Sequence, residues 1–394
     1  TQGPHGMTFP GHPAGSRRPE LMPDQNLHWI RGLRDYYLYS GDAETAAKLF
    51  PAVLRSLDWW SAYLAEDDLL HNVPGRFFAD EAGRVRAGVS AALNALYVGA
   101  LGDAADLADR LGQPEQADDY RVQASRTAAT LNDQLWDPQR RVYVDALVDG
   151  TRLDPVSQLT NGLMLFNRLP PPDRWGYMVD HVMESSRLKL RRPYVRREFA
   201  QKFDEREQVA LAHPIGWYFL FTGLDRVGLL PLAVEEIGDR WGWFLKEGAT
   251  AFPESWDLTG DVCRAGSAAP TYVLSASVLG VQPMEPGFTR FRVAPQPVGL
   301  SRAEGVFPSP AGDIRVAWES RRRGFDLTVT VPEGTVAEAA VPSAVASDLE
   351  IGGKVVWFKE SPRDKYPGLL RVYRSGGWLV CALKPGSYTI SRRP

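Results

Sequence analysis

Glu254 stands in a connector whose residue types could carry out acid–base chemistry. Residues 246–275, KEGATAFPESWDLTGDVCRAGSAAPTYVLS, join two apolar helical stretches, although a plain helix-to-helix link needs only a few residues. Phe252 and Trp256 flank the carboxylate, and Arg264 follows it by ten residues. A carboxylate that a Pro-bearing loop holds in place can act as a general base. The alternative is a surface or helix-capping carboxylate near the next helix.

Other polar residues could line the same binding site, and each has a structural alternative. Asp24 lies at the start of the first predicted helix, where capping that helix is the alternative. Asp80 and Glu81 follow two phenylalanines in a long connector and could form a pocket wall or cap the next helix. Asn94 could line the pocket from an inner helix, or it could be a core amide satisfied by its neighbours.

The composition excludes several function classes. The 394 residues carry a formal net charge of −3 with scattered Lys and Arg, so we expect no nucleic-acid partner. No apolar run approaches the roughly 20 residues of a membrane span. Cys263 and Cys381 are the only cysteines, so neither a disulfide framework nor a metal site is expected, and no cofactor is implied. The first residues contain no apolar core of a secretion signal, which leaves a bacterial cytoplasm or secretion open.

Helical periodicity dominates the chain up to about residue 282. About nine helices are predicted, around residues 24–41, 42–64, 85–111, 113–135, 155–168, 173–184, 207–222, 227–247 and 268–279. Alternating short and long connectors favour an (α/α)6-type toroid, in which the long loops gather at one end and form a pocket. A complete double ring needs about twelve helices, so we expect an incomplete toroid that lacks about three helices at its N-terminal side.

The pattern changes to a period of two residues after the helical part. Segments such as DIRVAWE, FDLTVTV and WLVCALK alternate apolar and polar residues and are separated by Gly, Pro and Asp turns. We therefore predict an antiparallel β-sandwich of about eight strands. The predicted domains are a toroid over residues 1–285 and a β-sandwich over residues 286–394, and the absence of His from the second domain places the chemistry in the first.

The order of several motifs resembles the C-terminal two-thirds of the bacterial α-L-rhamnosidases, family 78 of the glycoside hydrolases. Gly248, Ala249, Thr250, Glu254 and Trp256 are similar to that family's Gly-Ala-Thr-Thr-x-x-Glu-x-Trp signature. The other matching segments are MPDQNLHWIRGLRDYYLYSGD, GVSAALNALYVGAL, SQLTNGLMLFNRLPP, RWGWFLKEGATAFPESWD, SAAPTYVLSASVLGVQPMEPGF and SPAGDIRVAWE. The resemblance implies the toroid and sandwich, and it implies that Glu254 activates water for inverting cleavage of a terminal sugar.

Two departures from the family pattern bear on mechanism and substrate. The family's general acid belongs to an acidic Arg/Trp motif that precedes the segment starting at Pro23, where Glu20 is the only carboxylate, so the general acid is not identified in this chain. The family's Cys-His-x-Trp-Ser element appears with Arg264 in place of His and Gly266 in place of Trp. A guanidinium can bind a substrate carboxylate with two parallel hydrogen bonds, which a neutral sugar does not offer. These replacements therefore predict either an acidic substrate or an inactive site.

Three hypotheses about function follow from these residues. The leading one is an inverting hydrolase of a terminal α-L-rhamnosyl or related sugar linkage, in some substrates next to a uronic acid. The second is a lyase acting on a rhamnose–uronate linkage, with Arg264 neutralising the uronate carboxylate. The third is a non-catalytic carbohydrate-binding relative. A carbohydrate partner, with Asp24, Asp80, Asn94, Trp256 and Arg264 as its contacts, is common to the three.

Overall fold

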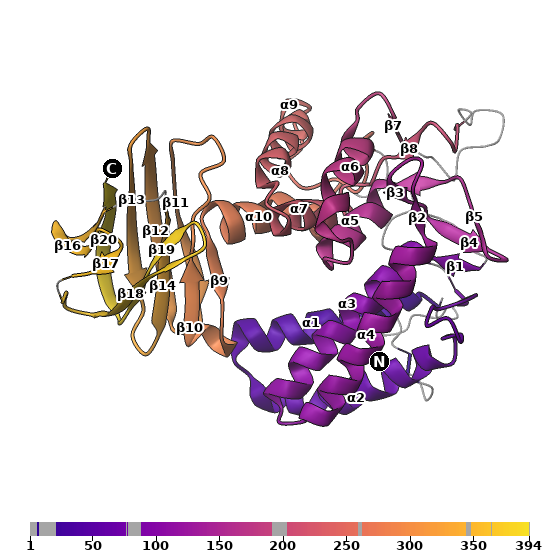
Figure 1. Ribbon diagram of the computed structural model, residues 1–394, viewed down its shortest axis with the longest axis horizontal. Coiled ribbons are helices and arrows are strands. Elements are labelled where there is room, and N and C mark those ends of the chain that lie inside the picture. Colours follow the sequence, from indigo (N-terminus) through magenta and orange to yellow (C-terminus); the bar gives the residue numbers. More distant parts are fainter. Residues whose placement is uncertain are drawn as a thin grey trace. The chain divides into compact units, whose positions relative to one another are not determined.

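The computed structural model describes residues 6–7, 21–75, 77, 88–190, 203–258, 262–343, 348–363 and 365–393. The chain divides into two compact units, one of Thr1–Arg34 with Ala46–Ala269 and one of Asp35–Thr45 with Pro270–Pro394. Helices make up most of the first unit and strands most of the second (Figure 1). None of the helices in the described ranges is long and apolar enough to cross a bilayer.

The α-helices in the described residues, counted with the π-helices that continue them, form nine segments, as the periodicity predicts. They are α1 (Pro23–Ser40), α2 (Ala43–Ser61), α3 (Ala91–Arg110), α4 (Pro114–Gln134), α5 (Gln158–Phe166), α6 (Pro172–Met183), α7 (Trp217–Arg226), α8 (Leu230–Glu236) continuing through the π-helix η3 (Ile237–Trp241) into α9 (Gly242–Lys246), and α10 (Ala269–Val273) continuing into the π-helix η5 (Leu274–Val278).

Side chains at the helix starts explain several of these boundaries. Asp42 precedes α2 and accepts a hydrogen bond from the Thr45 N–H at 3.0 Å. Hydrogen bonds from the Thr45 backbone and the Tyr36 hydroxyl lower the pKa of Asp42 to about 2. Ser90 caps α3 and Ser157 caps α5 through their hydroxyls.

The predicted helix over residues 207–222 is wrong in its first half. Residues Val209–Ala210 form strand β8, which pairs in parallel with β6 (Val156–Ser157) and β7 (Leu188–Lys189). Helix α7 begins only at Trp217, because Pro214 lacks an N–H and disfavours the helical conformation at the residue before it. The segment between β8 and α7 is therefore irregular, and it supports the candidate site.

Further short strands lie in the connectors of the first unit, where the sequence periodicity did not predict them. They are β1 (Val89–Ser90), β4 (Ala146–Val148) and β5 (Thr151–Arg152) in one sheet, and β2 (Trp136–Asp137) with β3 (Val142–Tyr143) in another. With two or three residues each, these strands are too short to show an alternating pattern.

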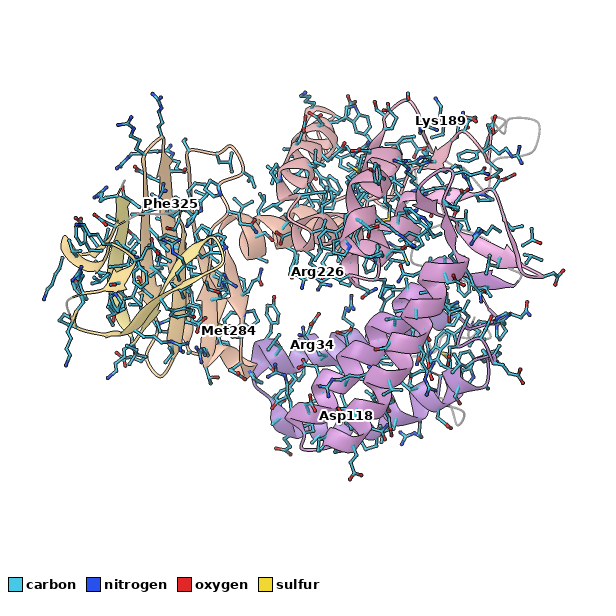
Figure 2. The ribbon with its side chains drawn as sticks, in the orientation of Figure 1. Arg34, Asp118, Lys189, Arg226, Met284 and Phe325 are labelled. Atoms are coloured by element: carbon cyan, nitrogen blue, oxygen red, sulfur yellow. The ribbon has the colours of Figure 1, made fainter. Side chains whose placement is uncertain are left out.

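The second unit contains a five-stranded and a seven-stranded sheet, in the orders β18-β19-β14-β10-β9 and β11-β12-β13-β20-β15-β16-β17. The strands are β9 (Val281–Pro283), β10 (Arg290–Val293), β11 (Arg302–Ser309), β12 (Gly312–Arg321), β13 (Gly324–Val331), β14 (Val336–Pro342), β15 (Asp348–Ile351), β16 (Lys354–Phe358), β17 (Ser361–Pro362), β18 (Leu369–Ser375), β19 (Trp378–Leu383) and β20 (Gly386–Arg393). The prediction of a purely antiparallel region is wrong at one pair, because β10 and β14 run parallel. Phe325 of β13, labelled in Figure 2, is buried in this unit. Its ring stacks on that of Trp318 of β12, with centroids 5.8 Å apart.

Candidate active site

The connector after α9 folds back on itself and brings its two ends together. Gly248 takes a φ of 80° just after α9, in the left-handed region that glycine adopts without strain. The Ala249 N–H donates to the Phe244 carbonyl at 2.9 Å, which closes the end of the helix. Farther along, the Arg264 N–H donates to the Phe252 carbonyl at 2.7 Å. This hydrogen bond places the residues that follow Phe252 beside the side chain of Arg264.

Glu254 and Arg264 form an ion pair on this connector. The Arg264 Nη2 donates to the Glu254 Oε1 at 2.6 Å, and the two side chains are 28% and 36% exposed respectively. A charge-assisted hydrogen bond of this length fixes the direction of the carboxylate while solvent still reaches it. Asp257 on the same connector accepts a hydrogen bond from the Ser255 hydroxyl at 2.7 Å.

Trp256 anchors the connector to the aromatic core of the first unit. Its indole Nε1 donates to the Ala212 carbonyl at 2.7 Å, and the Trp217 Nε1 donates to the same oxygen at 3.1 Å. The Trp256 ring stacks on Phe244 with centroids 5.2 Å apart and meets Trp241 edge-to-face at 5.1 Å. These contacts bury part of the ring, so the geometry supports a positioning role for Trp256 beside the predicted role in substrate contact.

Arg240 contributes a cation to the same aromatic cluster, and the sequence analysis did not single it out. Its guanidinium lies 4.8 Å from the Trp217 ring centroid and 5.6 Å from that of Trp256, and it pairs with Glu236. Arg240 belongs to the π-helix η3, a type of local irregularity that is frequent near functional sites. Its position between Glu236 and two indole rings suits a residue that stiffens the base of the connector.

Asp24 and Asn94 come from other helices. Asp24 lies in the first turn of α1, inside the helix rather than at its cap, and is 1% exposed. A carboxylate is favoured there by the positive end of the helix dipole. Asn94 of α3 is fully buried, with its Oδ1 accepting from the Leu70 N–H at 2.8 Å and its Nδ2 donating to the Leu70 and Ser90 carbonyls. These bonds favour the core-amide alternative for Asn94. Asp80 and Glu81 lie outside the described residues.

Asp145 is a second buried carboxylate, which the sequence alone did not indicate. Asp145 is 1% exposed, and its Oδ1 accepts hydrogen bonds from the Ser157 hydroxyl at 2.7 Å and the Thr160 hydroxyl at 2.6 Å. The Ala91 N–H also donates to the Asp145 carbonyl at 2.9 Å. Asp145 therefore ties the starts of α3 and α5 together. Ser157 before α5 was the available signal, but nothing in the sequence linked it to this carboxylate.

His28 of α1 is a half-buried imidazole with a lowered pKa. Its ring stacks on that of Phe219 of α7 at 5.6 Å. Burial, with a smaller contribution from the nearby Arg31, lowers the pKa of His28 to about 4, so the ring is neutral at neutral pH. Arg31 in turn pairs with Asp103 at 2.8 Å.

The Phe166 ring lies under two guanidinium groups. Those of Arg31 and Arg226, the latter labelled in Figure 2, are 4.3 and 4.2 Å from its centroid.

The described residues contain no group of His, Cys, Asp or Glu side chains arranged to hold a metal ion. The candidate site combines the ion pair of Glu254 and Arg264 with an aromatic base that the Arg240 guanidinium contacts. Such an arrangement offers a carboxylate that can accept a proton and a cation beside it.

Comparison with known proteins identifies relatives for both parts of the chain. Residues 280–355 match the bacterial α-L-rhamnosidase C-terminal domain, and residues 78–197 match the mannosylglycerate hydrolase MGH1-like glycoside hydrolase domain. An α-L-rhamnosidase from Alteromonas sp. (strain LOR) is 45% identical over 67 residues, which cover 17% of this chain and 7% of that protein.

Two solved structures extend the likeness. The family 78 rhamnosidase of Bacillus sp. GL1 has a TM-score of 0.69 and 27% identity, covering 82% of this chain and 33% of that one. The Streptomyces avermitilis α-L-rhamnosidase in complex with L-rhamnose has a TM-score of 0.71 and 18% identity, covering 99% of this chain and 35% of that one. This chain thus spans about a third of the length of either protein. By these likenesses the chain resembles the α-L-rhamnosidases of glycoside hydrolase family 78 in its fold and in part of its sequence.

Proposed function

We propose that the chain carries the general base of a glycoside hydrolase that cleaves a terminal α-L-rhamnosyl or related linkage with inversion. The observation that carries this proposal is the carboxylate of Glu254, which Arg264 orients at 2.6 Å while solvent reaches it. In an inverting mechanism, a carboxylate about 6.5–9.5 Å from the general acid deprotonates a water that attacks the anomeric carbon. A fixed, solvent-accessible carboxylate suits that role.

The proposal includes the architecture of the two domains. Paired helices over residues 1–285 would form an (α/α)6-type toroid, and residues 286–394 would form a β-sandwich from the two sheets. The likeness of fold to the α-L-rhamnosidase structures supports both assignments. In a toroid the loops at one end surround the substrate, which suits a base on a long inter-helix connector.

The roles of the other predicted residues follow from their surroundings. Arg264 orients Glu254 and, in substrates with a neighbouring uronate, supplies a cation for that group. Trp256 holds the connector in place next to Glu254 through its hydrogen bond to the Ala212 carbonyl. Asp24 contacts the sugar only if the helix start of α1 borders the site, and Asn94 maintains the scaffold.

The experiment replaces Glu254 with Gln, which keeps the shape of the side chain and removes the base. Turnover of an aryl α-L-rhamnoside should fall by about 10²–10⁴-fold, with little change in melting temperature, because general-base catalysis contributes that much. Glu247→Gln, an exposed change just after α9, is the matched control and should retain activity. Full activity of Glu254→Gln would remove Glu254 from the mechanism.

The choice of leaving group separates the contribution of the general base to turnover from that of the general acid. An activated dinitrophenyl α-L-rhamnoside has a leaving group that needs no protonation, so it reports the Glu254 step alone. Uptake of solvent ¹⁸O into the released sugar marks hydrolysis, and proton NMR of the first-formed anomer distinguishes inversion from retention.

One observation favours a lyase as the second candidate. A guanidinium beside a carboxylate base could neutralise a uronate and so make its C5 proton easier to remove. A lyase would generate the absorbance of an unsaturated uronate without incorporating solvent oxygen. Saturable sugar binding without either product would instead indicate a non-catalytic carbohydrate-binding protein.

A further inference from the structure

One face of the five-stranded sheet carries charged side chains instead of core residues (Figure 1). Arg292 of β10 lies opposite Glu338 of β14. Across the sheet, Glu338 and Arg371 of β18 both lie opposite Ala382 of β19. Because residues that lie opposite each other point to the same side of a sheet, these side chains share one face. The other face is apolar, and its fully buried residues include Phe291, Val293, Ala339, Leu379 and Cys381.

Three arginines and one carboxylate lie on this face, because Arg290 precedes Arg292 by two residues on β10. Arg290 and Arg371 both donate a hydrogen bond to the Oε1 of Glu338, the latter at 3.3 Å. Within the described part of the chain, Arg292 pairs with no carboxylate, and its guanidinium lies 5.9 Å from the ring centroid of Trp378. The four charged side chains therefore leave two positive charges in excess.

Glu338 fixes two of the guanidinium groups and leaves them accessible. Its side chain is 9% exposed, whereas those of Arg290 and Arg371 are 38% and 58% exposed. Burial alone would raise the pKa of Glu338, but hydrogen bonds from Arg290 and Arg371 and the charge of Arg290 lower it overall, so the carboxylate stays ionised at neutral pH. A guanidinium has five N–H donors, so one bond to Glu338 leaves others for an anion from solution. Arginines held in this way lose less conformational freedom when a ligand binds.

Two aromatic rings lie beside the arginines. Tyr373 follows Arg371 by two residues on β18, and the Arg371 guanidinium lies 4.6 Å from its ring centroid. Tyr373 lies opposite Val380 of β19, which makes Trp378 its diagonal neighbour, about 7–8 Å away. Both rings are partly exposed, and such rings can pack against the C–H faces of sugars. The name arginine face is used below for the six side chains Arg290, Arg292, Glu338, Arg371, Tyr373 and Trp378.

We propose that the arginine face binds a sugar chain that carries uronate carboxylates. The carboxylates accept parallel hydrogen bonds from Arg292 and Arg371. The sugar rings between them stack on Trp378 and Tyr373. The charge argues against a nucleic acid, because an interface with about 6–10 phosphate contacts needs more cations than two excess charges supply. The inference goes beyond the proposed function, since binding on this unit requires no cleavage by Glu254.

The first experiment uses calorimetry to measure the binding of hexagalacturonate to the full chain, with the fully methyl-esterified hexamer as the uncharged counterpart. Arg292→Ala and Arg371→Ala should each weaken the affinity for hexagalacturonate by about tenfold, because a hydrogen bond to a charged group contributes about that much. Trp378→Ala should weaken the affinity for both hexamers by about three- to tenfold. Arg323→Ala, which removes an exposed arginine from the turn between β12 and β13 of the other sheet, is the matched control and should change neither affinity.

The second experiment separates the arginine face from the candidate active site, where Arg264 offers another cation. In an Arg264→Ala background, Arg292→Ala should cause the same loss of affinity as in the wild type, because the two arginines belong to different units. A loss caused by Arg264→Ala but not by Arg292→Ala would place the uronate at the candidate active site and overturn the inference. The proposed function fails by a different result, full turnover of Glu254→Gln, which leaves binding at the arginine face untouched.

Other results of the same measurements would also contradict the inference. Absence of hexagalacturonate binding to the wild type would do so, as would equal affinity for the charged and the esterified hexamers. Equal losses from Arg323→Ala and Arg292→Ala would show that only net charge matters. A thymidine hexanucleotide that binds as tightly as hexagalacturonate, with the same dependence on Arg292, would make the face a general anion site. Arg292→Ala should melt as the wild type does, and a loss of affinity that always accompanied a lower melting temperature would indicate unfolding instead of a lost contact.

Discussion

Replacing Arg264 with Ala removes the guanidinium that orients Glu254, and we expect turnover to fall far more than stability. The pair joins Arg264 Nη2 to Glu254 Oε1 at 2.6 Å on side chains that are 28% and 36% exposed. Opposite charges about 4 Å apart attract by about 4 kcal/mol at an effective dielectric constant of about 20. Solvent at a part-exposed pair reduces the net contribution to about 1 kcal/mol, which corresponds to a fall of about 2–4 °C in melting temperature for a unit of this size.

The kinetic effect has a different origin. Without its orienting donor, the Glu254 carboxylate can rotate, which displaces its oxygens by about 1 Å from the position where they deprotonate the attacking water. Such a displacement lowers turnover by up to about a hundredfold. Arg264→Lys keeps the charge but not the planar geometry, so its activity should lie between wild type and Arg264→Ala. Arg264→His, which restores the residue of the family pattern, should shift preference from uronate-bearing substrates toward neutral rhamnosides.

A double-mutant cycle provides the assay. We would measure kcat and KM of the wild type, Glu254→Gln, Arg264→Ala and the double variant on one neutral and one uronate-bearing rhamnoside. If Arg264 acts by orienting Glu254, the double variant should be no slower than Glu254→Gln on the neutral substrate. Two losses that multiply on that substrate would refute the orienting role. An unchanged substrate profile and pH dependence in Arg264→His would refute the role in substrate charge.

Three further predictions concern the surroundings of the pair. Trp256→Phe keeps the ring stacking but removes the hydrogen-bond donor to the Ala212 carbonyl. Thermal melting should show a loss of about 1 kcal/mol of stability, and kinetics should show a lower turnover. An unchanged kcat would contradict the positioning role of Trp256. The pKa of His28 is about 4 when folded against 6.5 when unfolded, so the unfolded chain binds the extra proton and stability is lost as the pH falls from 6.5 toward 4. The loss should reach about 2 kcal/mol near pH 5, and the melting temperature of His28→Gln should fall less with acid if this account is right. Cys263 is exposed whereas Cys381 is buried with its pKa raised to about 12, so iodoacetamide should label Cys263 selectively and bound L-rhamnose should slow the labelling. Labelling at the same rate with saturating rhamnose would place the sugar away from this connector.

Local periodicity determined the types of most long elements. Successive helical segments appeared where apolar residues recur at helical spacing, and β13 appeared where Phe325, Leu327 and Val329 alternate with polar residues and are buried. These predictions succeed because backbone geometry alone decides which residues of one element share a face. The Asp42 cap of α2 is local in the same sense, because its side chain bonds a backbone N–H only three residues along the chain.

Elements that depend on distant partners were predicted less well. Strand β8 lies inside a stretch predicted as helix, and it forms because β6 and β7 offer backbone partners on both sides. Likewise, β10 pairs in parallel with β14 although both were expected in antiparallel sheets. Pairing between strands is a non-local property, so the order of residues within either strand does not reveal it.

The candidate site shows the same division. Residue types and the family resemblance singled out Glu254 and Arg264 from the sequence, because a carboxylate and a cation in one long connector are unusual in a plain link. Only the tertiary structure showed that the two bond each other and that Ala212 holds Trp256. An irregular connector has no repeating geometry, so the side chains that meet on it are decided by the packing of segments far apart in the chain.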